Sequence, residues 1–229
     1  MKTLAILAVA AALLAGGADA ASTPTTTGTN TVTVDGTGTV TAVPDQASFD
    51  FSVQTKAATA NAALTQNGTD VRAVIAAVEG AGVPEASIQT AQVSLSPVTS
   101  SNGTTIVGFT AYDTVTAINL AIAKAGSIVD AAVGAGATSV DGPSLTVSSQ
   151  DALYAQALEA AVAQAKTKAQ ALADAADEPL GQIVTMVEGG GQVTPLSLAA
   201  GAATAQSPTP IEPGTQQIQA TVTVTFGLG

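Results

Sequence analysis

Few residues of this chain could carry out chemistry. Its 229 residues include no histidine and no cysteine, which excludes Ser-His and Cys-His nucleophile pairs and the usual ligands of zinc, copper and haem. The carboxylates remain. Asp45 and Asp50 flank a turn and a strand, and Asp174, Asp177 and Glu178 gather at a predicted helix end. Such pairs could do acid–base work or bind Ca²⁺, but neither group has the Asp/Asn-Gly loop of an EF-hand, so solvated surface acids are the preferred interpretation.

Lysines and glycine-rich segments offer no better chemistry. Lys56, Lys166 and Lys168 lie in contexts typical of solvated side chains, and none follows a serine at helical spacing. The pair Gly36-x-Gly38 lacks the third glycine and the following helix of a dinucleotide site, and Gly189–Gly191 lacks the Lys-Ser/Thr of a P-loop. We therefore expect no catalytic residue, no cofactor and no metal, and we expect that the protein is not an enzyme.

Charge limits the possible partners. The formal net charge is −11, with only six lysines and arginines in the chain. These scattered cations cannot neutralise a phosphate backbone, which argues against nucleic-acid binding, and an anionic membrane surface is disfavoured for the same reason. Without cysteine there are no disulfides, so packing alone must hold the fold.

The N-terminus predicts export. A positive residue precedes the apolar run Leu4–Leu14, which is too short to span a bilayer. Ala18-Asp19-Ala20 then offers the small residues that a signal peptidase requires. We interpret residues 1–20 as a cleaved secretory signal and residues 21–30 as a flexible leader, and we expect no later transmembrane segment. The mature domain, residues 31–228, is expected in the periplasm or outside the cell.

Two strands are predicted after the leader. Apolar and polar residues alternate over 31–42 and again over 47–54, with the turn Pro44-Asp45 between them. We expect these strands to form a hairpin with one buried face. Gly36 and Gly38 interrupt the first strand, which predicts a bulge or a sharp bend there.

Two Gly-Ala-Gly units, 54 residues apart, organise the middle of the chain. Each ends an Ala/Val-rich helical pattern, about 57–81 and 126–133, and each precedes a strand-like run. Because the glycines follow a helix, they act as helix stops rather than as a phosphate-binding loop. The stop glycines are Gly80, Gly82, Gly134 and Gly136, and the first helix is expected to bury the stripe Leu64, Val71, Val74, Ile75 and Val78.

The longest helix is expected from Ser149 or Asp151 to about Asp177. Its apolar stripe is mostly alanine (Leu153, Ala157, Ala161, Ala165, Leu172, Ala176), so it can lie close to a sheet. A short strand over 182–188 and a final strand over 217–226 follow, separated by a Gly-, Ala- and Pro-rich stretch, 189–215. That stretch exceeds the usual loop length, which favours a flexible interaction arm; its candidate residues are Pro195, Pro208, Pro210, Ile211, Glu212, Pro213 and Gly214.

The order of these elements predicts the fold class. Strands joined by hairpins alternate with helices that return through short turns. We expect an α+β domain in which a mostly antiparallel sheet carries helices on one face. Since the helix–strand unit occurs twice, we expect two similar halves that share one sheet.

Several segments together resemble a known family. Val34-Asp35-Gly36-Thr37-Gly38 followed by Pro44-Asp45-Gln46-Ala47 is similar to the opening pattern of the SIMPL domain family (domain of unknown function 541). Gly108–Tyr112, Asp130–Ala137 and Pro210–Gly214 are similar to further signatures of that family in the expected order, and the match covers about 31–228. The family usually has Ala-Gly after the long helix where this chain has Ala176-Asp177; Asp tolerates left-handed geometry, so the helix should end there too.

The resemblance implies an extracytoplasmic α+β protein that self-associates, with stress-associated relatives and no established catalytic residue. Together with the missing catalytic groups, it predicts a non-enzymatic envelope protein that acts by self-assembly or by binding an unknown envelope partner or ligand. We expect a homo-oligomer. The alternative is a hydrolase or a sugar-binding protein that uses the carboxylates Asp45, Asp50, Asp174 and Asp177.

Overall fold

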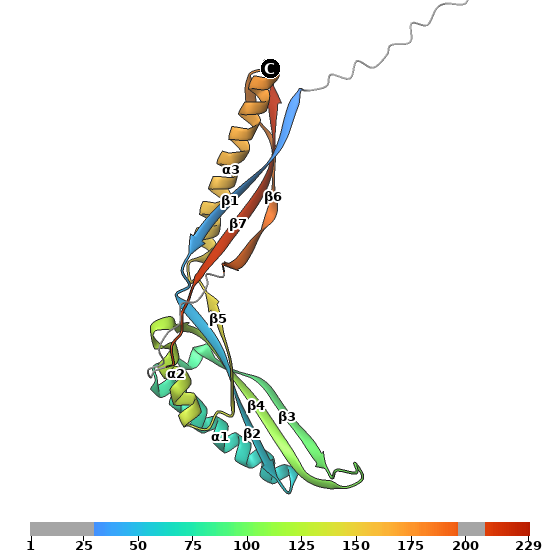
Figure 1. The fold of residues 1–229 in the computed structure, drawn as a ribbon, viewed down its shortest axis with the longest axis vertical. Coiled ribbons are helices and arrows are strands. Elements are labelled where there is room, and N and C mark those ends of the chain that lie inside the picture. The colour runs from blue at the N-terminus through green and yellow to red at the C-terminus, as the bar shows by residue number, and fades with distance from the viewer. Residues whose placement is uncertain (1–29, 197–208) are drawn as a thin grey trace, which may run out of the picture.

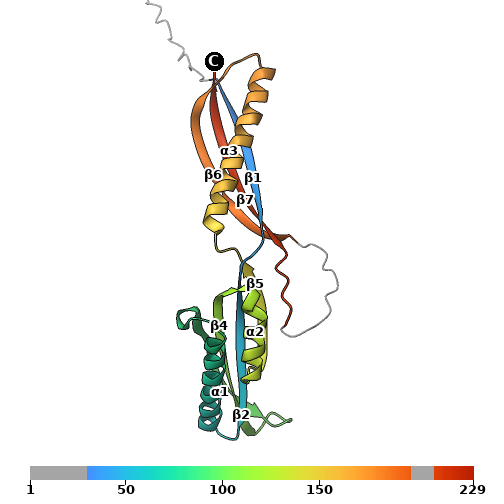
Figure 2. The same cartoon turned by 90° about the vertical axis from the view of Figure 1, so that its left-hand side faces the viewer.

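The molecule is long and bent. The computed structural model describes residues 30–196 and 209–229, and its strands form two antiparallel sheets placed end to end (Figure 1). The turned view shows that each sheet carries its helices on one face (Figure 2). The predicted signal, residues 1–20, and nearly all of the predicted leader lie outside the described residues.

The first layer consists of three strands and one helix. The strand order is β1-β7-β6, with all pairs antiparallel, and α3 lies across β1 and β7 rather than β6. The elements are β1 (Thr31–Ala42), α3 (Gln150–Ala175), β6 (Leu180–Leu196) and β7 (Thr215–Leu228).

An alanine stripe brings α3 very close to the sheet. The five fully buried residues of α3 are all alanines, spaced four apart from Ala157 to Ala173. Across from them lie Gly36 and Gly38 of β1. A Cβ on Gly38 would lie 2.5 Å from the Ala161 nitrogen, and a Cβ on Gly36 would lie 2.9 Å from the Ala165 nitrogen. The glycines therefore make room for the helix backbone.

The second layer consists of four strands and two helices. The strand order is β3-β4-β2-β5, all antiparallel, and the chain runs β-α-β twice, which is the split β-α-β arrangement of ferredoxin-like folds. A short 3₁₀ turn, Glu85–Ser87, precedes β3. The elements are β2 (Gln46–Ala57), α1 (Ala60–Gly80), β3 (Ile88–Thr99), β4 (Ile106–Ala121), α2 (Ile122–Gly134) and β5 (Ser139–Thr146).

The core of this layer is thicker, because larger side chains fill it. Phe49 and Phe51 of β2 stack with ring centroids 6.0 Å apart, under Val74 and Val78 of α1 and Ile128 of α2. The stripe predicted for α1 is correct from Val71 onward.

One turn of α1 differs from the prediction. Leu64 is 42% exposed. Instead, Asn67 is buried, and its amide donates to the Val53 carbonyl at 2.9 Å. The hydrogen bond satisfies the buried amide, so a polar residue replaces the expected apolar one on the buried face.

The two Gly-Ala-Gly units end their helices in the same way. Ala81 and Ala135 donate to carbonyls four residues back, Gly82 and Gly136 donate to carbonyls three residues back, and the next residue donates to a carbonyl five back. Gly82 has φ +98° and Gly136 has φ +112°, a conformation that glycine adopts without steric cost. The predicted helix stops are confirmed.

The α+β class and the antiparallel pairing are confirmed, but four details are wrong. The strands form two sheets rather than one. β1 and β2 do not form a hairpin, because they belong to different sheets. The pairing of β1 with β7 runs without a register shift from Thr31 to Ala42, so Gly36 and Gly38 mark no bulge. Leu172, placed in the buried stripe of α3 from the sequence, is 51% exposed.

Candidate functional site

The bend between the two layers is held by Asp45. This residue follows Pro44 in the link from β1 to β2, and it meets the link from β5 to α3. Asp45 Oδ1 accepts from the Ser148 backbone N–H at 2.7 Å, and Oδ2 accepts from the Ser148 hydroxyl at 2.5 Å. The Asp45 backbone also donates to Thr146 O at 3.1 Å. One carboxylate thus joins the two links at the bend.

These bonds stabilise the charged form of Asp45. The hydrogen bond from the Ser148 hydroxyl, followed by that from the Ser148 backbone, lowers the pKa of the Asp45 carboxyl below its ordinary value of 3.8. A carboxylate with a lowered pKa and both oxygens engaged serves as an acceptor, not as a general acid at neutral pH. Asp45 is therefore a structural group of the bend.

A third link crosses the bend. Residues 209–214 run from the second layer to the start of β7. The Thr209 hydroxyl donates to Asp130 Oδ1 of α2 at 2.7 Å, and a side chain on Gly126 would collide with the Thr209 backbone. Ile211 packs against the core of the second layer. This segment therefore attaches the first layer to α2.

The predicted interaction arm, 189–215, is wrong in extent. Residues 189–196 belong to β6, where Pro195 pairs with Gln216 of β7. The segment from Pro210 to Gly214 runs beside α2, and its residue Glu212 is exposed. Pro208 lies outside the described residues. Because this stretch is rich in Gly, Ala and Pro and has no period, its sequence pattern predicted neither the end of β6 nor the packed link.

The candidate carboxylates bind neutral partners. Asp50 accepts from the Thr116 hydroxyl at 2.5 Å, and Asp174 accepts from the Gln170 amide at 2.8 Å. Asp177 has φ +55° at the end of α3, which confirms the predicted left-handed helix end, and Glu178 follows it. The 30–196 and 209–229 ranges contain no group of three or more acids that could hold a metal ion.

The three candidate lysines lie in different places. Lys168 donates to the Asp35 carbonyl at 2.8 Å and so ties α3 to β1. Lys56 is an exposed residue of β2. Lys166 lines a groove beside α3, which the sequence did not predict.

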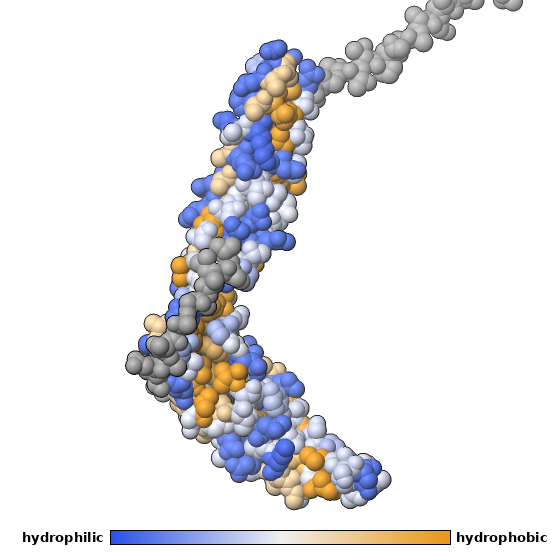
Figure 3. Space-filling model, in the orientation of Figure 1, coloured by the Kyte–Doolittle hydropathy of each residue, from blue (hydrophilic) through white to orange (hydrophobic). Residues whose placement is uncertain are grey.

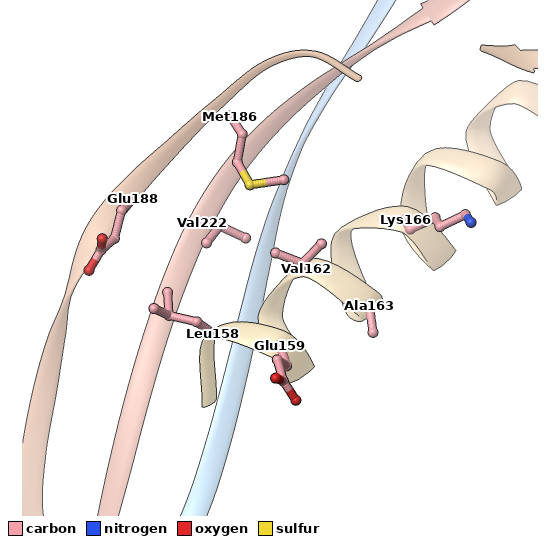
Figure 4. A pocket seen from close by; sticks show the side chains of 8 residues that line it. All are labelled: Leu158, Glu159, Val162, Ala163, Lys166, Met186, Glu188 and Val222. Carbon is pink, nitrogen blue, oxygen red and sulfur yellow. The ribbon is translucent and has the colours of Figure 1, made fainter. Parts of the chain in front are cut away.

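That groove lies between α3 and β6. It has a volume of about 550 Å³, and its apolar lining consists of Leu158, Val162, Met186 and Val222. Figure 4 shows the side chains of Met186 and Val222 directed toward Leu158 and Val162. Three charged residues also line the groove: Glu159, Lys166 and Glu188.

Tyr154 bonds to Glu188, one of the charged residues of the groove. Its ring lies over Gly191 of β6, where a Cβ would be 2.8 Å from the ring carbon Cζ. Its hydroxyl donates to Glu188 Oε1 at 2.5 Å, and this bond to Glu188 raises the pKa of the Tyr154 hydroxyl above its ordinary value of 10.0. The pair ties α3 to β6 at this one position.

β6 exposes an unusual amount of apolar surface for an edge strand. Five of its large apolar side chains are between 41% and 62% exposed: Ile183, Val184, Met186, Val187 and Val193. The space-filling view shows apolar surface along this side of the first layer (Figure 3). Within the described ranges, no helix is both long and apolar enough to span a membrane.

The central strand of the second layer holds a second unusual group. Asp113 of β4 is only 9% exposed, on the helix-covered face opposite Val53, and its Oδ1 has no hydrogen-bond partner. Burial raises the pKa of the Asp113 carboxyl above 3.8. Asp113 alternates with the buried residues Ala111 and Val115, and this period of two is the sequence signal that could have placed it on the buried face.

The profile of the SIMPL family, described as a protein of unknown function (DUF541), matches residues 32–226. The chain belongs to the SIMPL family. It is similar to the 26 kDa periplasmic immunogenic protein of Brucella melitensis, with 30% identity over 200 residues that cover 82% of this chain and 80% of the relative. The protein of the same name from Brucella abortus matches to the same extent. Both names agree with the expected periplasmic location.

The structure assigns a role to each SIMPL motif of this chain. The Val-x-Gly-x-Gly strand is β1, whose glycines accept the backbone of α3. The Pro-Asp motif forms the bend, where Asp45 joins two links. The segment from Pro210 to Gly214 is the link along α2. In this chain, the glycine motif packs α3 on β1 within the first layer, and the other two motifs connect the two layers.

Proposed function

We propose that this SIMPL protein is a non-enzymatic periplasmic protein that acts by assembling with copies of itself. The observation that carries the proposal is the apolar surface of β6. Among the described residues, this strand is an edge of its sheet and is 17 residues long, and five of its large apolar side chains stand outside the cover of α3. Natural edge strands are usually short, charged or covered, so a strand of this kind fits an interface.

The arrangement of the carboxylates favours this proposal over the hydrolase or sugar-binding alternative. Asp45, Asp50 and Asp174 each bind a hydroxyl or amide group of the protein itself. A glycosidase needs two carboxyl groups that face one substrate bond. An assembled envelope protein could serve in stress defence, as the resemblance suggests, and the phenotype of a deletion strain tests that role.

Light scattering on the mature chain tests assembly. At micromolar concentrations we expect a mass that is a multiple of the monomer mass. Replacing Met186 by Lys should reduce that mass, because this residue lines the apolar groove between α3 and β6 and a charge there disfavours an apolar contact. Met186 is 45% exposed in the monomer, so folding should be preserved. Val133→Lys on α2, at a residue 51% exposed, is the matched control and should leave the mass unchanged. A strictly monomeric parent chain would refute the proposal.

A further inference from the structure

The first layer has room on its helix side beside α3. Strands lie about 4.8 Å apart and an α-helix is about 10 Å wide, so one helix covers about two strands. α3 covers β1 and β7 and makes few contacts with β6. The helix side of β6 therefore has no covering element within the described part of the chain.

The uncovered strip is apolar. Ile183, Met186 and Val193 of β6 pair with Phe226, Val224 and Ile218 of β7, respectively. Since these β7 residues are buried under α3, their partners in β6 project to the same side of the sheet. They are nevertheless 47%, 45% and 41% exposed. Met186 lines the groove together with Leu158 and Val162 of α3 (Figure 4), and Ile183 and Val193 extend the apolar strip along β6 on either side of it.

Charges on α3 indicate what covers the groove. Glu159 and Lys166 both line it, and they lie seven residues apart, which places them on one stripe of the helix about 10.5 Å apart along its axis. They are too far apart for the i, i+4 pair that stabilises a single helix. A second α3 running antiparallel, with its crossing point between Val162 and Ala163, would place Glu159 beside Lys166 of the partner subunit. The same symmetry places Lys166 beside Glu159 of the partner subunit.

The residues at that crossing point suit a close approach. Ala163 is small and exposed, and Val162 is half-buried, so two helices can meet there without large side chains between them. A parallel arrangement would instead place Glu159 beside Glu159 of the partner subunit. The sequence of the stripe therefore selects the antiparallel orientation.

We propose that two copies of this chain close their α3–β6 grooves against each other across a two-fold axis, with the two α3 helices antiparallel and paired through Glu159 and Lys166. This inference rests on the proposed function and names the surface through which assembly occurs. A two-fold contact uses the same patch on both copies, so one stripe supplies both charges and both apolar surfaces.

Cross-linking tests the contact directly, because the chain contains no cysteine of its own. In the mature chain carrying Ala163→Cys, the two thiols would lie near the two-fold axis. A short bismaleimide should join most of the protein into covalent dimers. The matched control is Ala123→Cys, an exposed alanine on α2, which should give little covalent dimer. Equal, low yields from both variants, from a parent chain that is still an oligomer, would overturn this contact while leaving assembly intact.

Charge exchange tests the orientation. Glu159→Lys and Lys166→Glu should each weaken dimer formation about tenfold or more, because each places like charges together twice per dimer. The double variant restores opposite charges and should return to within about threefold of the parent. Circular dichroism of each variant verifies its fold. If the double variant lost as much dimer affinity as the two single variants together, the antiparallel pairing would be overturned. A monomeric parent whose groove binds an apolar dye would overturn both this contact and assembly, since a small ligand would then occupy the groove.

Discussion

Replacing Gly38 by Ala should strongly destabilise the first layer. The new Cβ would lie 2.5 Å from the Ala161 nitrogen and closer still to the Ala157 carbonyl oxygen. These are helix backbone atoms, which cannot rotate away as a side chain can. Because favourable contacts begin near about 3.5 Å, α3 would have to retreat by at least about 1 Å. A gap of that size forfeits up to about half of the dispersion energy of the contacts that it separates.

The retreat would open the whole alanine stripe from Ala157 to Ala173, because a helix moves as a rigid rod. Overpacking typically costs about 1–3 kcal/mol, and we expect the upper end, about 3 kcal/mol, for this substitution. Chemical denaturation followed by circular dichroism should show a lower midpoint with an unchanged slope.

The matched control is Gly68→Ala. Gly68 lies inside α1, and the nearest atom to a new Cβ is the flexible end of Arg72 at 3.5 Å. Alanine is a better helix former than glycine by about 1 kcal/mol, so this variant should be slightly more stable than the parent. If Gly38→Ala changed the stability by less than about 0.5 kcal/mol, the close approach of α3 to β1 would be refuted.

Two further predictions concern single carboxyl groups and their pH dependence. Asp45→Asn should lower the unfolding midpoint at pH 7. Since the pKa of Asp45 is lowered on folding, the contribution of its charge to folding stability is present above pH 3.8 and is lost below it. The unfolding midpoints of parent and variant should therefore converge in acid. A difference that persists unchanged at pH 2 would contradict the role of the charge at the bend. Asp113→Asn should raise stability at pH 7 by about 1 kcal/mol, because a buried amide costs less than a buried carboxylate with an unpartnered oxygen. Since the pKa of Asp113 is raised on folding, that gain should vanish as the pH falls through the folded-state pKa toward 3.8; a loss of stability in Asp113→Asn at neutral pH would show that the charge has a partner.

Local patterns predicted most of the elements correctly. The alternation of 31–42 and the alanine spacing of α3 are properties of neighbouring residues, and the structure confirms the first fully and the second from Ala157 to Ala165. The Gly-Ala-Gly helix ends were predictable because glycine conformation is also local. Leu64 and Asn67 show the limit: which face of a helix turn is buried depends on a hydrogen bond to Val53, which is distant in sequence.

Long-range arrangement was not encoded in any short pattern. Pro44-Asp45 looks like the turn of a hairpin, and only Ser148, about a hundred residues later, shows that it is a bend between two sheets. A pair of glycines in a strand, such as Gly36 and Gly38, can mark either a bulge or a close contact with a helix. The local sequence is the same in both cases. The groove between α3 and β6 arises because one helix covers two of three strands, which no segment of the sequence reveals alone.

The central claim is that this SIMPL protein assembles through the side of β6 that α3 leaves open. Its most direct test is the molar mass of the mature chain in solution by light scattering, measured beside a variant with Met186→Lys in the groove. The account predicts a multiple of the monomer mass for the parent and a shift toward the monomer for the variant. A monomeric parent, or an oligomer that the charge in the groove does not affect, would contradict it.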